Sequence, residues 1–308
     1  MPETSLTSLI EKYLHLQEQK RKKKIRTLKK ETIFAIVLVL VASFATDYFF
    51  SIDLGLLYAI LAIAYLIYTM ITRYNKYKSE YTESFIRPLM KHLIPAFDYS
   101  PKEVVKRELV VNSGIYPTKF NIFKGEDLFS GKIQGVNLGF SEVSVANEEK
   151  SRGSNKRSAP KYFLQGLFFY MQGNFNHYHP FYIRTINTTI SIHAKAKGPF
   201  DFKKKIRLDH KDWVTRFELF VDDDNSQIPE VSLELFTRLQ RLEELLMSVT
   251  PLAHIALSVK PHFISIALQP IKIFEPPILK NALEHQEKLE CNLQIIEELI
   301  SLREFFAN

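Results

Sequence analysis

Two long stretches almost without charge dominate the first quarter of this 308-residue chain. Residues 33–50 contain one charged side chain, Asp47, and residues 54–71 contain none. A helix rises 1.5 Å per residue, so a stretch of this length reaches roughly 27 Å, close to the thickness of about 30 Å of a bilayer's hydrocarbon core. Soluble cores rarely use two such runs in succession. The pattern therefore predicts two transmembrane helices, at about 33–50 and 54–71.

The connector between the two stretches, residues 51–53, is short enough to predict a tight antiparallel hairpin. Small side chains along both stretches would let the two helices approach closely; they are Ala42, Ser43, Ala45, Gly55, Ala59, Ala62 and Ala64. A cleaved signal peptide is the weaker alternative. The apolar region of a signal peptide lies near the N-terminus, whereas about thirty residues precede the first stretch here.

Basic residues are concentrated immediately before the first apolar stretch. Residues 20–30 contain eight Lys and Arg and no acid: Lys20, Arg21, Lys22, Lys23, Lys24, Arg26, Lys29 and Lys30. The whole chain has 41 Lys and Arg against 34 Asp and Glu, so the remainder is close to balance. The excess charge is therefore local, which argues against a nucleic-acid binder with a uniformly basic surface and predicts no nucleic-acid partner.

Residues 1–31 form a cytoplasmic arm in this interpretation. Its first part has apolar residues at helical spacing, at Leu6, Leu9, Ile10, Tyr13 and Leu16, and the basic run follows directly. One interpretation is an interfacial helix whose eight cations bind the head groups of anionic lipids, with each cation contributing about 1 kcal/mol. The other is that the cations only orient the membrane helices. The sequence leaves both open.

The distribution of charge also predicts an orientation in the membrane. The basic run precedes the first apolar stretch, and Arg73, Lys76 and Lys78 follow the second. The positive-inside rule then places both termini in the cytoplasm, as expected for a two-pass protein of a plasma (inner) membrane. The glycosylation sequon at Asn187 would lie in the wrong compartment, and the lone Cys291 would lie in a reducing one.

The remaining chain predicts a juxtamembrane helix over 73–97 and a cytoplasmic α+β domain over 98–308. Nine of the ten glycines fall between 114 and 198, among short runs of alternating apolar and polar residues that indicate antiparallel hairpins. A Leu-rich middle helix follows Pro229, a further hairpin covers 255–268, and a long C-terminal helix covers about 278–305. The fold class is thus α+β, with a transmembrane hairpin before an antiparallel sheet.

Four segments that follow the apolar stretches resemble the bacterial membrane proteins grouped as domain of unknown function 3137. The similarity covers roughly 81–308 and is carried by residues 125–131, 140–143, 163–168 and 216–222. Residues 223–229 match the family's pattern only loosely. The resemblance implies two N-terminal membrane helices, a cytoplasmic domain and a protein partner in the cell envelope. It supplies no catalytic residues, because the family has no established activity.

Few residues suggest a catalytic or metal-binding role. His177 and His179 would lie on one face of a strand, a spacing that can ligate zinc, but two ligands do not make a site. Glu126 and Asp127 could form a carboxylate pair, although adjacent residues on a strand or tight turn point apart, which favours a structural turn. Residues 222–224, three aspartates, are most simply a solvated turn, with a magnesium site as the minor interpretation.

No nucleophile, cofactor or phosphate-binding motif is present, so the sequence predicts neither catalysis nor a cofactor. The preferred hypothesis is a membrane protein that presents an α+β module for binding another protein or a lipid. The alternative is an enzyme at the membrane surface that uses Glu126, Asp127, His177 and His179. The two differ in whether these four side chains converge at one place.

Overall fold

The computed structural model describes residues 3–50, 55–116, 119–148, 159–186, 204–208, 211–222, 231–276 and 282–307. The chain divides into two compact units. The first contains residues 1–89 and 275–286, and the second contains residues 90–274 and 287–308. Each unit is described by itself below.

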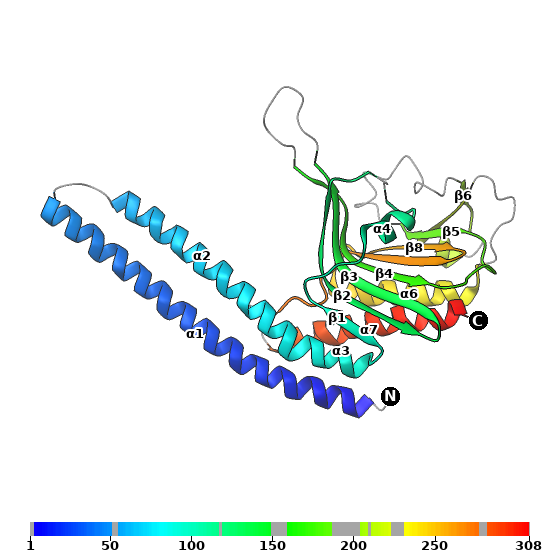
Figure 1. Cartoon of the computed structure of the whole chain (residues 1–308), viewed down its shortest axis with the longest axis horizontal. Helices are drawn as coiled ribbons and strands as arrows, with labels where there is room; N and C mark the ends of the chain where they lie inside the picture. The colour runs from blue at the N-terminus through cyan, green and yellow to red at the C-terminus, as the bar shows by residue number, and fades with distance from the viewer. Residues whose placement is uncertain are drawn as a thin grey trace, which may run out of the picture. The chain divides into compact units, whose positions relative to one another are not determined.

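The first unit is built around two long helices, α1 (Glu3–Phe50) and α2 (Gly55–Tyr81), which run antiparallel beside each other (Figure 1). A short π-helical turn, η1 (Thr82–Ile86), continues α2, and α3 (Arg87–Leu93) follows it. Three aromatic rings, Tyr77, Tyr81 and Phe85, contact one another in sequence along α2 and η1. Because α1 runs from Glu3 to Phe50, the charged arm and the first apolar stretch belong to one continuous helix.

This arrangement contradicts the predicted membrane hairpin. Among the residues that the structure describes, no helix combines the length and the apolar character needed to cross a membrane. The prediction treated 33–50 and 54–71 as separate spans. In the structure, each stretch is one end of a longer helix whose other end is charged. In α1 the charged end carries the basic run, and in α2 it carries Arg73 and the charged residues after it. The predicted fold class is wrong in this part, and so are the two-pass placement in an inner membrane and the orientation of the termini.

The second unit contains a sheet of nine antiparallel strands in the order β1-β2-β3-β4-β9-β8-β5-β7-β6. Its three long strands follow one another in the chain: β2 (Ile122–Ile133), β3 (Val136–Asn147) and β4 (Lys161–Gln172). The shorter strands are β1 (Phe97–Ser100), β5 (Phe181–Thr185), β6 (Lys204–Ile206), β7 (Phe217–Val221), β8 (His254–Lys260) and β9 (Phe263–Gln269). Strands β1 and β6 form the edges. The helices are α4 (Arg107–Asn112), α5 (Lys211–Val214), α6 (Leu233–Val249) and α7 (Ala282–Ala307).

Long-range pairing joins the two halves of this sheet. Strand β4 pairs with β9, so that Leu167 lies opposite Leu268. Gly166 lies where the two strands approach closest, because a Cβ atom there would stand 2.0 Å from the carbonyl oxygen of Leu268. Gly135 has a different role. Its positive φ of 87° forms the turn between β2 and β3, a conformation that glycine adopts without steric cost.

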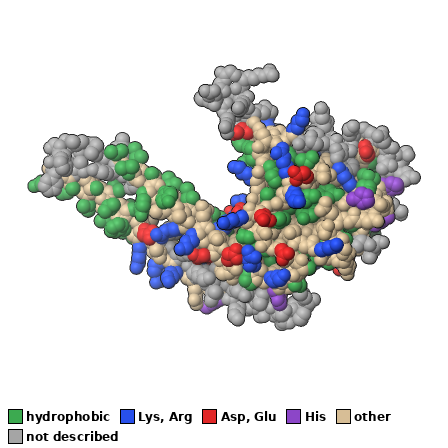
Figure 2. Space-filling model, in the orientation of Figure 1, with side chains coloured by type: hydrophobic (Ala, Val, Ile, Leu, Met, Phe, Trp, Pro, Cys, Tyr) green, Lys and Arg blue, Asp and Glu red, His purple; other side chains and the backbone are tan. Residues whose placement is uncertain are grey.

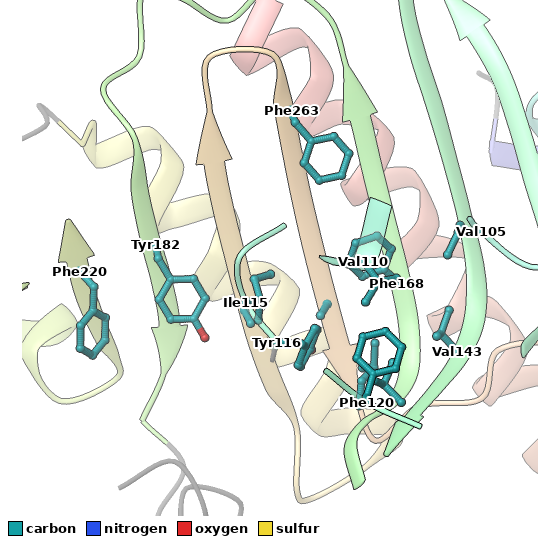
Figure 3. Close-up of a cluster of buried hydrophobic side chains, with 14 residues drawn as sticks. Val105, Val110, Ile115, Tyr116, Phe120, Val143, Phe168, Tyr182, Phe220 and Phe263 are labelled. Carbon is teal, nitrogen blue, oxygen red and sulfur yellow. The ribbon is translucent and has the colours of Figure 1, made fainter. Parts of the chain in front are cut away.

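Helices α6 and α7 run along one face of the sheet (Figure 1). Ser232 caps α6 by accepting a hydrogen bond from the backbone of Leu235, and a stripe of buried leucines follows. A polar contact joins the two helices, from the guanidinium of Arg238 to the hydroxyl of Ser301 at 2.9 Å. A hydrophobic cluster packs α4 and the segment after it against the strands (Figure 3). Its labelled members include Val110, Tyr116, Phe168 and Tyr182.

Candidate functional site

The two helices of the hairpin face each other through small and paired side chains. Ala35 is buried and Ala42 is half-buried on α1, which allows the backbones to approach. At one level of the hairpin, Arg73 of α2 forms an ion pair with Glu31 of α1. This pair marks a boundary, because the exposed residues on one side of it are charged or polar and most of those on the other side are apolar.

One row of exposed side chains runs along α1 across this boundary. Its members follow one another at intervals of three or four residues, which places them on one face of a helix: Lys22, Arg26, Lys29, Ile33, Val37, Leu40, Phe44 and Tyr48. The first three are cations and the last five are apolar. Phe44 and Tyr48, the most exposed of the apolar members at 74% and 73%, stack on each other. We call this row the α1 stripe.

Helix α2 also carries a row of exposed apolar side chains. Ile60, Ile63, Ile67 and Met70 are each more than half exposed and recur at intervals of three and four residues. Figure 2 shows hydrophobic side chains covering this end of the hairpin and Lys and Arg side chains gathered next to it. Large exposed apolar surfaces of this kind are rare on monomeric proteins and occur at protein–protein and membrane interaction sites.

The eight cations of the basic run do not all face solvent. Lys22, Lys23, Arg26, Lys29 and Lys30 are exposed, whereas the side chains of Lys20 and Lys24 lie outside the described set. Arg21 is turned inward, and its guanidinium donates two hydrogen bonds to Glu18, at 2.5 and 2.6 Å. These bonds raise the pKa of Arg21 and lower that of Glu18.

Arg21 also lies near the second helix. Burial raises the pKa of Tyr77 on α2 to about 12, and the charge of Arg21 opposes that shift. The electrostatic interaction runs in both directions, since Tyr77 also acts on the pKa of Arg21. Arg21 therefore belongs to the packing between the helices. Its neighbour Lys22 also approaches Glu18, with Nζ 3.5 Å from the carboxylate, but 71% of the Lys22 side chain stays exposed.

Three carboxylates meet at a second place, on the sheet. Oxygen atoms of Glu126, Asp127 and Glu142 all lie within 4.8 Å of one another. The expectation that Glu126 and Asp127 point apart is wrong. Their strand carries a bulge between Glu126 and Phe129, and Asp127 adopts a φ of 61° that turns its side chain towards the same point. Glu142 arrives from β3, directly opposite Glu126 in the register.

Two of these carboxylates are anchored by the fold. Asp127 accepts a hydrogen bond of 2.5 Å from the hydroxyl of Tyr99. Glu142 accepts hydrogen bonds from the backbone N–H groups of Ile273 and Phe274, at 2.8 and 3.1 Å. Three carboxylate oxygens suit a hard cation or a shared proton. The contacts that the structure shows, however, assign Asp127 and Glu142 to holding strand β1 and the segment after β9 in place.

Sequence reasoning missed Glu142 as a partner of Glu126 and Asp127. Residues 140–143 attracted attention as part of a resemblance, but nothing in their order reveals which strand lies opposite. The signal that could have found Glu142 is the hairpin turn. Residue pairs across this hairpin can be counted outward from the turn at Gln134 and Gly135. The count places Glu142 opposite Glu126 only when the bulge is included.

The structure does not bring His177 and His179 into this cluster. Both are exposed and lie in a turn between β4 and β5, so their prediction on a strand is wrong. The His177 ring contacts that of Tyr178, whose hydroxyl donates to the carbonyl oxygen of Phe305 at 3.2 Å. In the described part of the chain, the group of three potential metal ligands contains carboxylates and no histidine. Asp222 is exposed at the end of β7, and the rest of the 222–224 run lies outside the described residues.

Comparison of the chain with protein-family models, with curated proteins and with solved structures gave no match. The resemblance to domain of unknown function 3137 stays a prediction. The function therefore has to be argued from the geometry of the hairpin and of the sheet.

Proposed function

We propose that this chain binds an anionic lipid surface through its helical hairpin and presents its sheet unit there for interaction with other molecules. The observation that carries the proposal is the α1 stripe, in which three exposed cations lead directly into five exposed apolar side chains on one helix face. Helices that bind the interface of a bilayer combine these two features. The apolar side chains contact the acyl boundary and the cations contact the phosphates of the head groups.

The magnitudes favour binding. Full burial of a Leu, Ile, Val or Phe side chain contributes about 1.5–3 kcal/mol. The five apolar members of the α1 stripe are between 50% and 74% exposed, so each has about 1 kcal/mol or more to gain. Each exposed cation near an anionic surface adds about 1 kcal/mol. The alternative in which the cations only orient two membrane spans loses its premise, because the described helices contain no candidate span.

Charge also favours a lipid surface over a second copy of the chain. Two hairpins that joined through their stripes in parallel would bring two sets of exposed cations together, and like charges repel. In an antiparallel pair, the cations of one copy would lie beside the apolar side chains of the other. An anionic surface attracts the same cations and covers the same apolar side chains. The arrangement of charge and apolar surface thus matches a lipid surface better than another copy of itself.

A vesicle flotation assay on the full-length chain tests the proposal. The protein is incubated with preformed vesicles, and the fraction that floats is measured against lipid concentration. Anionic vesicles are expected to bind at least about 100-fold more tightly than neutral ones, because five exposed cations contribute about 1 kcal/mol each. Raising the salt from 0.1 to 1 M should remove most of this difference, because the Debye length falls from about 10 to about 3 Å.

A matched pair of variants separates the apolar contribution. Replacing Leu40 and Phe44 together by Gln preserves charge and helix propensity but removes two exposed apolar side chains, and it should weaken binding about tenfold or more. Asn75→Gln, on the charged half of α2, should bind like the wild type. Equal flotation of the double variant and the wild type would overturn the proposal. So would a stable dimer that dissociates in the double variant while neither protein binds vesicles.

A further inference from the structure

We infer that the hairpin binds several separate monoanionic phosphodiester head groups on a flat surface, and that it responds to their charge density. The exposed cations make this contact, whereas Arg21 does not; they are Lys22, Lys23, Arg26, Lys29 and Lys30. The inference rests on the proposed lipid binding and specifies the chemistry of the partner. A single polyphosphate head group is the alternative. The geometry of α1 distinguishes the two.

The exposed cations are spread along the helix. Lys22, Arg26 and Lys29 belong to one row and cover a rise of roughly 10 Å at 1.5 Å per residue. Lys23 and Lys30, also exposed, flank this row. A helix surface is convex, so neighbouring side chains on it diverge outwards. Recognition of one polyphosphate requires several cations that converge on it from the walls of a concave site. Diverging cations fit several separate phosphates on a flat surface.

Arg21 is set apart from this group by its contacts. Its two hydrogen bonds to Glu18 and its proximity to Tyr77 hold the guanidinium on the side of α1 that faces α2. Lys22 also lies 3.5 Å from Glu18, so exposure separates the two cations: the Arg21 side chain is 14% exposed and that of Lys22 is 71% exposed. The adjacent residues therefore carry the same charge but have different roles. Arg21 positions α1 against α2, and Lys22 contacts the head groups.

The experiment compares full-length wild type, Lys22→Gln, Lys29→Gln and Arg21→Gln on vesicles of matched net surface charge. One set contains a monoanionic phospholipid, and the other contains fewer molecules of a lipid with a polyphosphorylated head group. A third arm replaces chloride by inorganic phosphate at constant ionic strength. Circular dichroism of each variant checks that the helices remain formed.

Wild type should bind the two charge-matched vesicle sets within about twofold of each other, and inorganic phosphate should not compete. Lys22→Gln and Lys29→Gln should each bind about fivefold more weakly, because each loses one cation near the surface. Arg21→Gln should bind like the wild type while its helix content melts at a lower temperature. Tenfold or greater preference for the polyphosphorylated lipid, competition by phosphate, or a loss in Arg21→Gln equal to that in Lys22→Gln would overturn the inference. Absence of binding to every vesicle would instead contradict the proposed function itself.

Discussion

Replacing Glu142 tests how the sheet unit holds the segment after β9. One of its carboxylate oxygens accepts hydrogen bonds from the buried N–H groups of Ile273 and Phe274. Glu142→Ala leaves both donors without this acceptor, and each buried unsatisfied group costs about 1–3 kcal/mol. The free energy of unfolding should therefore fall by about 2–6 kcal/mol. Glu142→Gln keeps an acceptor oxygen and removes a negative charge close to Glu126 and Asp127, so it should lose less than half as much.

Urea unfolding measures both effects. The sole tryptophan, Trp213, stacks on Phe236 with ring centroids 4.3 Å apart, and it lies in the same compact unit as Glu142. Its fluorescence should report the transition of that unit. The midpoint should shift in the order wild type, Glu142→Gln, Glu142→Ala, with an unchanged slope. If Glu142→Ala unfolds at the same urea concentration as the wild type, or if both variants lose equally, the hydrogen bonds do not carry the stabilisation.

Two further changes test the same unit. Burial lowers the pKa of His254 to about 4, and the neighbouring charge of Arg184 adds to the shift. In the unfolded chain the pKa of a histidine is about 6.5, so the folded protein has its full stability above that pH. The free energy of unfolding should fall by up to about 3 kcal/mol as the pH decreases towards 4. His254→Gln should flatten this part of the stability profile, and an unchanged profile would contradict the assignment. Gly166→Ala places a Cβ atom 2.0 Å from the Leu268 carbonyl oxygen and should cost about 3 kcal/mol or more, whereas Gly135→Ala meets no neighbour and should cost about 1 kcal/mol from its positive φ. Equal thermal shifts for the two glycine variants would refute the close approach of β4 and β9.

Some helices and hairpins of the sheet unit could be predicted because their patterns depend only on residues that are close in the sequence. The predicted Leu-rich middle helix corresponds to α6, in which Leu235, Leu239, Leu242 and Leu246 are buried. The expected hairpin over 255–268 corresponds to β8 and β9. The helix starts at Leu233, after the Ser232 cap, because the hydroxyl supplies a hydrogen-bond acceptor to the first turn.

Other features depend on contacts that sequence order does not reveal. The pairing of β4 with β9 joins residues about a hundred positions apart, and no local pattern specifies it. The carboxylate cluster depends on one bulge and one positive φ at Asp127. The membrane prediction failed for a related reason. Composition within a window identifies an apolar stretch, but it does not show that the stretch continues a charged helix, as 33–50 does in α1.

The most direct test of lipid binding reads the environment of single positions on the hairpin. In a Cys291→Ser background, which removes the lone thiol of the chain, Phe44→Cys and Asn75→Cys are each labelled with a polarity-sensitive fluorophore on the full-length protein. Addition of anionic vesicles should shift the emission of the label at position 44 to the blue and leave the label at position 75 unchanged, because only the first lies on the apolar part of the α1 stripe. Unchanged emission at both positions, or equal shifts at both, would contradict the claim that this stripe contacts a lipid surface.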